Sequence, residues 1–152
     1  HLQEVDLSNN KVKNLDALAG LTHVEKLDLS GTHVEDLAPL RNLTRLRWLS
    51  VSHTPVEDLG PLMQLEALEE LDASETRVRT VPRLDRMGAL RTLILHGVPL
   101  ADVRALESAP QKLSRLGISP HLLQPQDLRA LRAAYPYVEI DMRKAEDETL
   151  RR

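Results

Sequence analysis

The chain has 152 residues, the usual size of one domain, and 41% of them are hydrophobic, which is enough for a core. Only 2% are aromatic and Phe is absent, so we expect an aliphatic core that repeats one kind of packing site. The net charge of −3 disfavours a nucleic-acid partner, the absence of Cys excludes disulfides and thiolate zinc sites, and no apolar run reaches the ~18 residues of a membrane span.

A repeat of 22 residues starts at the beginning of the chain and continues through most of it. Leu27, Leu49, Leu71 and Leu93 are each 22 residues apart. Apolar residues occupy repeat positions 1, 4, 6, 11, 14, 17 and 20 in five units, which start at Leu2, Val24, Leu46, Leu68 and Leu90. A sixth unit starts at Leu113 after one extra residue and then departs from the pattern. A fixed period of this length predicts a stacked repeat architecture.

Each unit predicts a short strand followed by a tight return. Positions 4 and 6 alternate as in a half-buried strand, and the apolar residues from position 11 onward recur every third residue, as in a 3₁₀-like turn. Because one coil cannot bury its apolar side alone, the coils must stack. We expect the side chain at position 9 to bond backbone groups of the neighbouring coil; Val98 cannot do so, and the fifth coil should differ locally.

The segment from Leu27 to Thr44 resembles the 22-residue class of leucine-rich repeats, which bacterial internalin-type and eukaryotic phosphatase-regulator proteins share. Its Asp-Leu-x-Pro-Leu element, at Asp36 and again at Asp58, is most similar to the internalin-like form. The resemblance covers roughly residues 2–118. It implies an α/β solenoid, a right-handed leucine-rich-repeat superhelix with parallel strands on the concave face and 3₁₀ or irregular turns on the convex face. It also implies that the concave face recognises a protein.

The repeats are expected to fill residues 1–119 in about five and a half coils, followed by a helix-and-strand cap at 120–142. Pro125 can open a helix, Pro136 ends it, and the alternation from Val138 to Met142 predicts a last strand. The charged tail 143–152 should fray. The chain begins at His1, without Met and inside a repeat, so we expect a fragment or processed product. Its first strand should be covered by upstream sequence or a partner.

Residues between the core positions of each strand should face the concave surface and contact a partner. Trp48 lies outward on the third of seven predicted strands and is the candidate hot spot. The acidic residues around it predict either a partner with a basic patch or an ordinary solvated surface, and both interpretations remain open. The predicted partner-binding residues are Glu4, Asp6, Lys26, Asp28, Trp48, Ser50, Glu70, Asp72, Thr92, Ile94 and Arg115.

No catalytic, metal or cofactor site is predicted, since the sequence has no HExxH motif, Gly-rich phosphate loop or GxSxG elbow. The predicted function is therefore a non-enzymatic protein–protein interaction module. Two alternatives remain: the regulatory domain of a larger GTPase, kinase or ubiquitin ligase, and an extracellular internalin-like adhesin. No signal peptide is visible, which slightly favours a cytoplasmic over a secreted location, but the compartment is left open.

Overall fold

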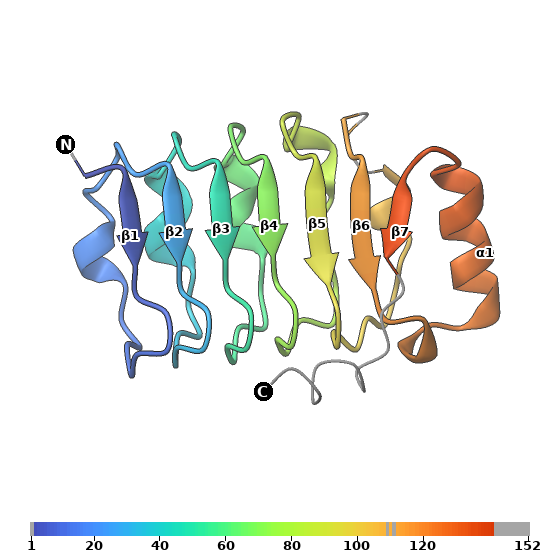
Figure 1. Cartoon of the computed structure of the whole chain (residues 1–152), viewed down its shortest axis with the longest axis horizontal. Coiled ribbons are helices and arrows are strands. Elements are labelled where there is room, and N and C mark those ends of the chain that lie inside the picture. The colour runs from blue at the N-terminus through green and yellow to red at the C-terminus, as the bar shows by residue number, and fades with distance from the viewer. Residues whose placement is uncertain (1, 109, 111, 142–152) are drawn as a thin grey trace.

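Seven short parallel strands form one sheet and follow one another across it in chain order (Figure 1). The computed structural model describes residues 2–108, 110 and 112–141. The 22-residue spacing places equivalent residues side by side, so that Leu27, Leu49 and Leu71 pair in register. The predicted solenoid is confirmed. Its strands are β1 (Glu4–Asp6), β2 (Lys26–Asp28), β3 (Trp48–Ser50), β4 (Glu70–Asp72), β5 (Thr92–Leu95), β6 (Arg115–Ile118) and β7 (Glu139–Asp141).

The return of each of the first five coils carries a short 3₁₀ helix, and these helices lie behind the sheet in Figure 1. A sixth 3₁₀ helix follows β6 directly. The Asp-Leu-x-Pro-Leu element has a physical role here. The side chain of Asp36 accepts the backbone N–H of Ala38 at 2.8 Å, and Asp58 accepts that of Gly60 at 2.7 Å. Each carboxylate thereby fixes the turn that begins the helix. The helices are η1 (Asp16–Leu18), η2 (Ala38–Asn42), η3 (Gly60–Gln64), η4 (Leu84–Arg86), η5 (Leu106–Ser108) and η6 (Pro120–Leu122).

The aliphatic core fills the space between the sheet and the 3₁₀ helices. Leu27 and Leu49 on the strands are 0% exposed. On the 3₁₀ helices of the same coils, Leu40 is 0% exposed and Leu62 is 1% exposed. The first coil differs, because Val5 and Leu7 are only partly buried and Leu2 is 56% exposed. Stacking on both sides therefore buries the inner coils fully, and the first coil is stacked on one side only.

The bend after each strand departs from one expectation. The threonine hydroxyls at position 9 donate to a carbonyl of their own coil just after the strand, not to the neighbouring coil: Thr32 to Leu29 O at 2.7 Å and Thr76 to Ala73 O at 2.8 Å. The hydroxyl is close enough to satisfy a carbonyl three residues earlier, so no reach to the next coil is needed. Around Val98 the fifth coil does differ, since the Gly97 N–H is bonded to the Ser119 hydroxyl at 2.8 Å.

A helix and a strand end the described chain. Helix α1 (Pro125–Ala134) begins and ends where its two flanking prolines predict, buries Leu131 and packs against η5. Strand β7 then pairs with β6, with Ile140 beside Leu116. Met142 and the tail 143–152 lie outside the described residues, and the domain boundaries stay a prediction. Among the described helices, none has the length and apolar character needed to cross a bilayer.

Candidate protein-binding face

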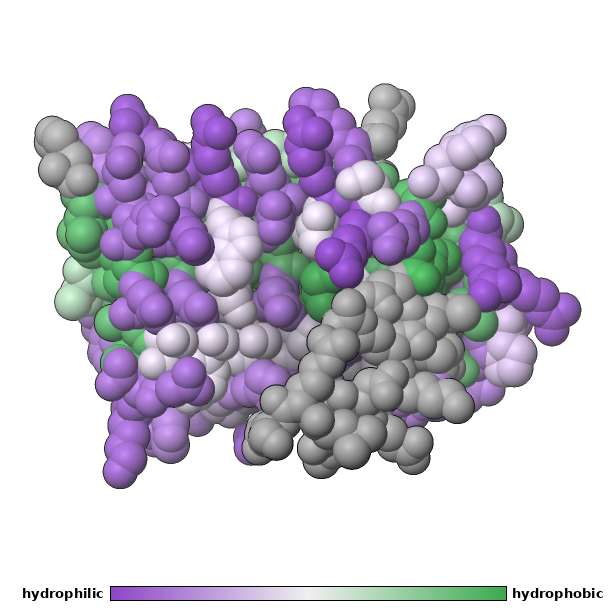
Figure 2. Space-filling view, in the orientation of Figure 1, coloured by the Kyte–Doolittle hydropathy of each residue, from purple (hydrophilic) through white to green (hydrophobic). Residues whose placement is uncertain are grey.

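The outward side of the sheet, called the sheet face below, carries the predicted partner-binding residues in two rows. Position 3 of each repeat forms one row and position 5 the other, because the strands pair without a register shift. In Figure 2, which views this face, hydrophilic side chains cover most of the area over β1–β4. The first row is Glu4, Lys26, Trp48, Glu70, Thr92 and Arg115, and the second is Asp6, Asp28, Ser50, Asp72 and Ile94.

Trp48 lies on the sheet face rather than in the core. Leu49 and Val51, its neighbours in β3, are 0% exposed and fill the core positions, whereas Trp48 is partly exposed. Lys26 comes from the adjacent strand and places its Nζ 5.4 Å from the centre of the Trp48 ring, within cation–π range. Trp48 therefore stands in its row between the cationic Lys26 on β2 and the acidic Glu70 on β4.

Ser50 has the same place in its row as the aspartates of β2 and β4, but it is only 4% exposed. Its Oγ lies 3.1 Å from the Oγ of Ser52, so the two hydroxyls bond each other. Ser50 offers a partner little surface. Because its side chain is short, the surface at Ser50 is lower than at Asp28 and Asp72 on either side.

The aspartates of the second row have a structural role that sequence reasoning missed. Asp6, Asp28 and Asp72 each accept, with Oδ1 at 2.9 Å, the backbone N–H of the serine two residues later. These bonds hold the chain as it leaves the strand. The signal was the recurring Asp-x-Ser tripeptide, which starts at each of these aspartates. The acidity of the row thus serves the fold as well as any partner.

Hydrogen bonds from Ser8 also favour the charged form of Asp6. The Ser8 side chain and then its backbone amide lower the pKa of Asp6 below its ordinary value of 3.8. Desolvation opposes this lowering, and the charge of Lys26 makes the smallest contribution to it. Lys26 therefore favours the charged form of Asp6, but less than Ser8 does.

The negative charge of the protein is concentrated on this part of the sheet face. Over β1–β4 the two rows hold five carboxylates and one ammonium, a formal charge of −4, whereas the whole chain carries −3. The carboxylates are those of Glu4, Asp6, Asp28, Glu70 and Asp72. The rest of the chain therefore has a formal charge of +1.

Ile94 belongs to a different part of the face from Trp48. Gly117 of β6 has no side chain, and a Cβ there would lie 2.8 Å from His96 Nε2 and 3.0 Å from Ile94 Cδ1. Ile94 and His96 thus lean over Gly117, toward β6. The sheet does not bring Trp48 and Ile94 together, because Glu70 and Asp72 on β4 stand between their strands.

Comparison with known proteins agrees with this architecture. A model for leucine-rich repeats in two copies matches residues 1–42. The chain has the fold of a leucine-rich-repeat solenoid. Among solved structures, its fold is similar to those of an internalin from Listeria monocytogenes (TM-score 0.77, 18% identity), internalin C2 from the same species (0.76, 23%) and a leucine-rich-repeat protein from Leptospira interrogans (0.73, 19%).

The chain spans about half the length of these solved structures. The similarity covers 94%, 91% and 93% of this chain, but 48%, 60% and 43% of the three solved chains in the same order. A search of curated proteins by sequence found no match. The likeness is therefore one of fold, internalin-like in form, and leucine-rich-repeat folds are typically protein-interaction modules.

Two hollows of the protein lie away from the sheet face. One, between η2 and η3, is lined mainly by polar residues that include Asp58 and Gln64. The other lies at the bends after β2–β4 and includes His33, His53 and Arg77. Within the described part of the chain, no group of His, Asp and Glu residues could hold a metal ion.

Proposed function

We propose that this leucine-rich-repeat protein binds a partner protein on its sheet face, with Trp48 as the central contact, and that it does no catalysis. One observation carries the proposal: the single Trp of the chain is partly exposed at the middle of a row fixed by strand pairing. Partly exposed Trp residues on rigid surfaces often supply much of the energy of a protein interface, because they bury a large area at little entropic cost.

We further propose that the contacting surface of the partner is positively charged. The formal charge of −4 over β1–β4 would steer such a surface to the sheet face. This surface-charge proposal predicts that the association rate falls as salt is added, because exposed charges are screened at distances beyond about 10 Å at 0.1 M ionic strength. A partner whose association rate did not change with salt would contradict it.

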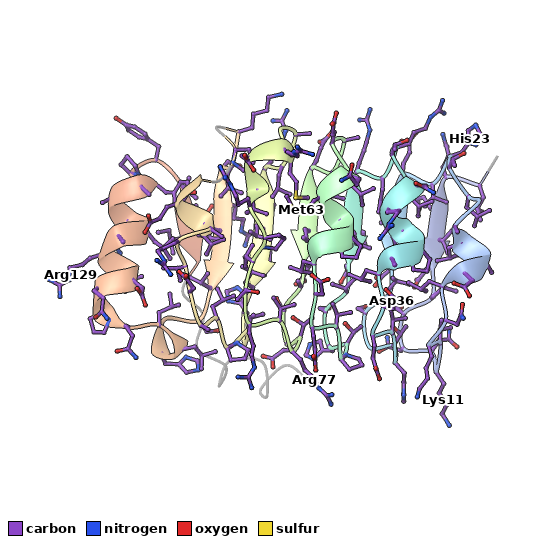
Figure 3. The ribbon with its side chains drawn as sticks, turned by 180° about the vertical axis from the view of Figure 1, so that it is seen from behind. Lys11, His23, Asp36, Met63, Arg77 and Arg129 are labelled. Atoms are coloured by element: carbon purple, nitrogen blue, oxygen red, sulfur yellow. The ribbon has the colours of Figure 1, made fainter. Side chains whose placement is uncertain are left out.

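The test uses a partner captured from the source organism on the immobilised chain, purified, and measured by calorimetry against three forms of the protein. Trp48→Ala should weaken binding by about 2 kcal/mol or more, roughly thirtyfold, without changing the fold. Met63→Ala is the matched control, because Met63 is a partly buried hydrophobic side chain on η3, behind the sheet (Figure 3). If Met63→Ala weakened binding and Trp48→Ala did not, the partner would bind the opposite side of the molecule.

A second candidate role is that of an internalin-like adhesin, and the similarity of fold to two Listeria internalins favours it. An adhesin must be reachable from outside the cell. Antibodies raised against this chain should then label intact cells of the source organism, and external protease should remove the label. Labelling that requires permeabilised cells would exclude this role.

A further inference from the structure

We propose that the Trp48 ring receives an arginine side chain of the partner, and that Lys26 occupies this place while the protein is free. The inference rests on the proposed function and specifies the partner chemistry at the same site. It starts from the contact between Lys26 Nζ and the Trp48 ring at 5.4 Å, which shows that the ring accepts a cation in its present position.

Lys26 is easily displaced from the ring. Its side chain is exposed, and none of the ion pairs of the described residues involves it. An exposed ammonium is strongly hydrated and sits on a flexible stem, so that its hold on an aromatic face is weak. A cation that made additional bonds at the same place would replace it.

Carboxylates around the ring supply those additional bonds. Glu70 lies beside Trp48 on the neighbouring strand, and Asp28 and Asp72 flank the short Ser50. The two aspartates use Oδ1 for the turn N–H of Ser30 and Ser74, which leaves Oδ2 to accept from a partner. The short side chain of Ser50 leaves room for a side chain of the partner between Asp28 and Asp72.

Arginine fits this arrangement better than lysine. A planar guanidinium can stack on an indole while its N–H groups donate in the plane to carboxylates, whereas an ammonium offers no plane to stack. The formal charge of −4 over β1–β4 is complementary to a basic segment that carries such an arginine. The occupant we assign is therefore an arginine-bearing segment of a protein.

The fluorescence of Trp48 reports on this site alone, because the chain has one Trp. The whole chain is titrated with synthetic peptides of equal length in which arginine, lysine or glutamate alternates with glycine. The arginine peptide should change the emission in a saturable way and bind about threefold or more tightly than the lysine peptide. The glutamate peptide should cause no saturable change. Equal affinity for arginine and lysine, or no change with arginine, would overturn the proposal.

Charge variants separate displacement of Lys26 from a general effect of charge. Lys26→Met should raise the affinity for the arginine peptide severalfold, because the competing cation is gone. Lys13→Met removes the same charge from an exposed position outside the two rows of the sheet face and should raise it much less. An equal rise in both variants would show that Lys26 does not compete for the ring. Circular dichroism of each variant checks that the fold is kept.

Variants of the acids test the second half of the assignment. Glu70→Gln and Asp72→Asn should weaken binding of the arginine peptide severalfold, and Asp72→Asn keeps an oxygen to accept the Ser74 N–H. Glu57→Gln, at an exposed position outside the two rows, is the matched control and should change it little. If the control weakened binding as much, the peptide would be responding to net charge.

The experiments distinguish a failure of the arginine assignment from a failure of the proposed function. If a purified partner depends on Trp48 but arginine peptides do not bind, the arginine assignment is wrong and the interaction face stands. If arginine peptides bind at Trp48 but the partner ignores Trp48→Ala, the proposed function is wrong.

Discussion

At the scale of single residues, position 8 of each coil requires a left-handed backbone. Five residues there, each 22 positions from the next, have φ between 54° and 67°: Asn9, Gly31, His53, Glu75 and Gly97. Gly and Asn tolerate this conformation, whereas other residues are strained in it. At Gly31 an added Cβ would also lie 2.6 Å from the Asn9 side-chain oxygen, so that the Asn9 side chain would have to move.

The strain at position 8 can be relieved at Glu75. We expect Glu75→Asn to stabilise the protein by up to about 1 kcal/mol, because Asn adopts the left-handed region at lower cost. Urea denaturation followed by circular dichroism measures the change. Glu57→Asn, where φ is not positive, serves as the control and should be neutral within about 0.5 kcal/mol. A gain at Glu57 equal to that at Glu75 would contradict the strain argument.

The pKa of Asp6 tests which neighbour holds its charge. Ser8→Ala should raise the pKa of Asp6 more than Lys26→Met does, because the Ser8 side chain is the largest cause of the lowering. Carboxyl NMR during an acid titration measures both. Since the folded pKa lies below the ordinary 3.8, the stabilisation is complete above that pH and is lost as the pH falls through the folded value. A larger effect of Lys26→Met would reverse this order.

At the scale of elements, the side-chain oxygen at repeat position 13 fixes the turn that leads into the 3₁₀ helix. Asp36 and Asp58 precede helices of five residues, while the fourth coil has Thr80 at this position and Pro82 where the bonded N–H would be. Because Pro has no N–H, this side-chain bond cannot form before η4. The bond does not set the length of the helix, since the Asn14 side-chain oxygen accepts the Asp16 N–H at 2.6 Å and η1 also has three residues.

Asp36→Ala should therefore destabilise the protein by about 1 kcal/mol, the typical cost of losing a side-chain bond of this kind to a backbone N–H. Asp36→Asn keeps an acceptor oxygen and should lose much less. Thermal denaturation of both variants gives the comparison. An equal loss in the two would show that the charge matters and the hydrogen bond does not.

The elements also show where sequence reasoning ends. Periodicity predicted the strands, their register and the 3₁₀ returns, because each coil buries the same apolar positions against its neighbours. The two prolines predicted α1. The outward position of Trp48 was also predictable, because Leu49 and Val51 occupy the core positions of the repeat, and both are buried in the structure. The burial of Ser50, the cation–π contact of Lys26 and the lean of Ile94 over Gly117 did not follow. They depend on side-chain conformations and on the size of neighbours one coil away, which a repeat pattern does not encode.

At the scale of the whole molecule, the two ends of the described solenoid are unlike. At the C-terminal end, α1 and β7 follow the last repeats, and α1 buries Leu131 against them. At β1 no such element lies among the described residues, and Val5, Leu7 and Val12 of the first coil are only partly buried, although Leu15 is buried. Because stability in a solenoid is roughly a sum over neighbouring coils, the first coil should contribute the least.

Two leucines at repeat position 6 of adjacent coils test this gradient directly. Leu29 is 0% exposed between the first and third coils, whereas Leu7 is partly buried at the end of the stack. Leu29→Ala should cost about 2–5 kcal/mol, the range for a fully enclosed leucine, and Leu7→Ala clearly less, since water already reaches that site. Chemical denaturation measures both, and the matched positions remove differences of residue type and strand geometry. Native-state hydrogen exchange should also show faster opening at β1 than at β3. Equal costs for the two leucines would mean that the first coil is as well supported as the inner ones, and stacking on one side could not explain its exposure.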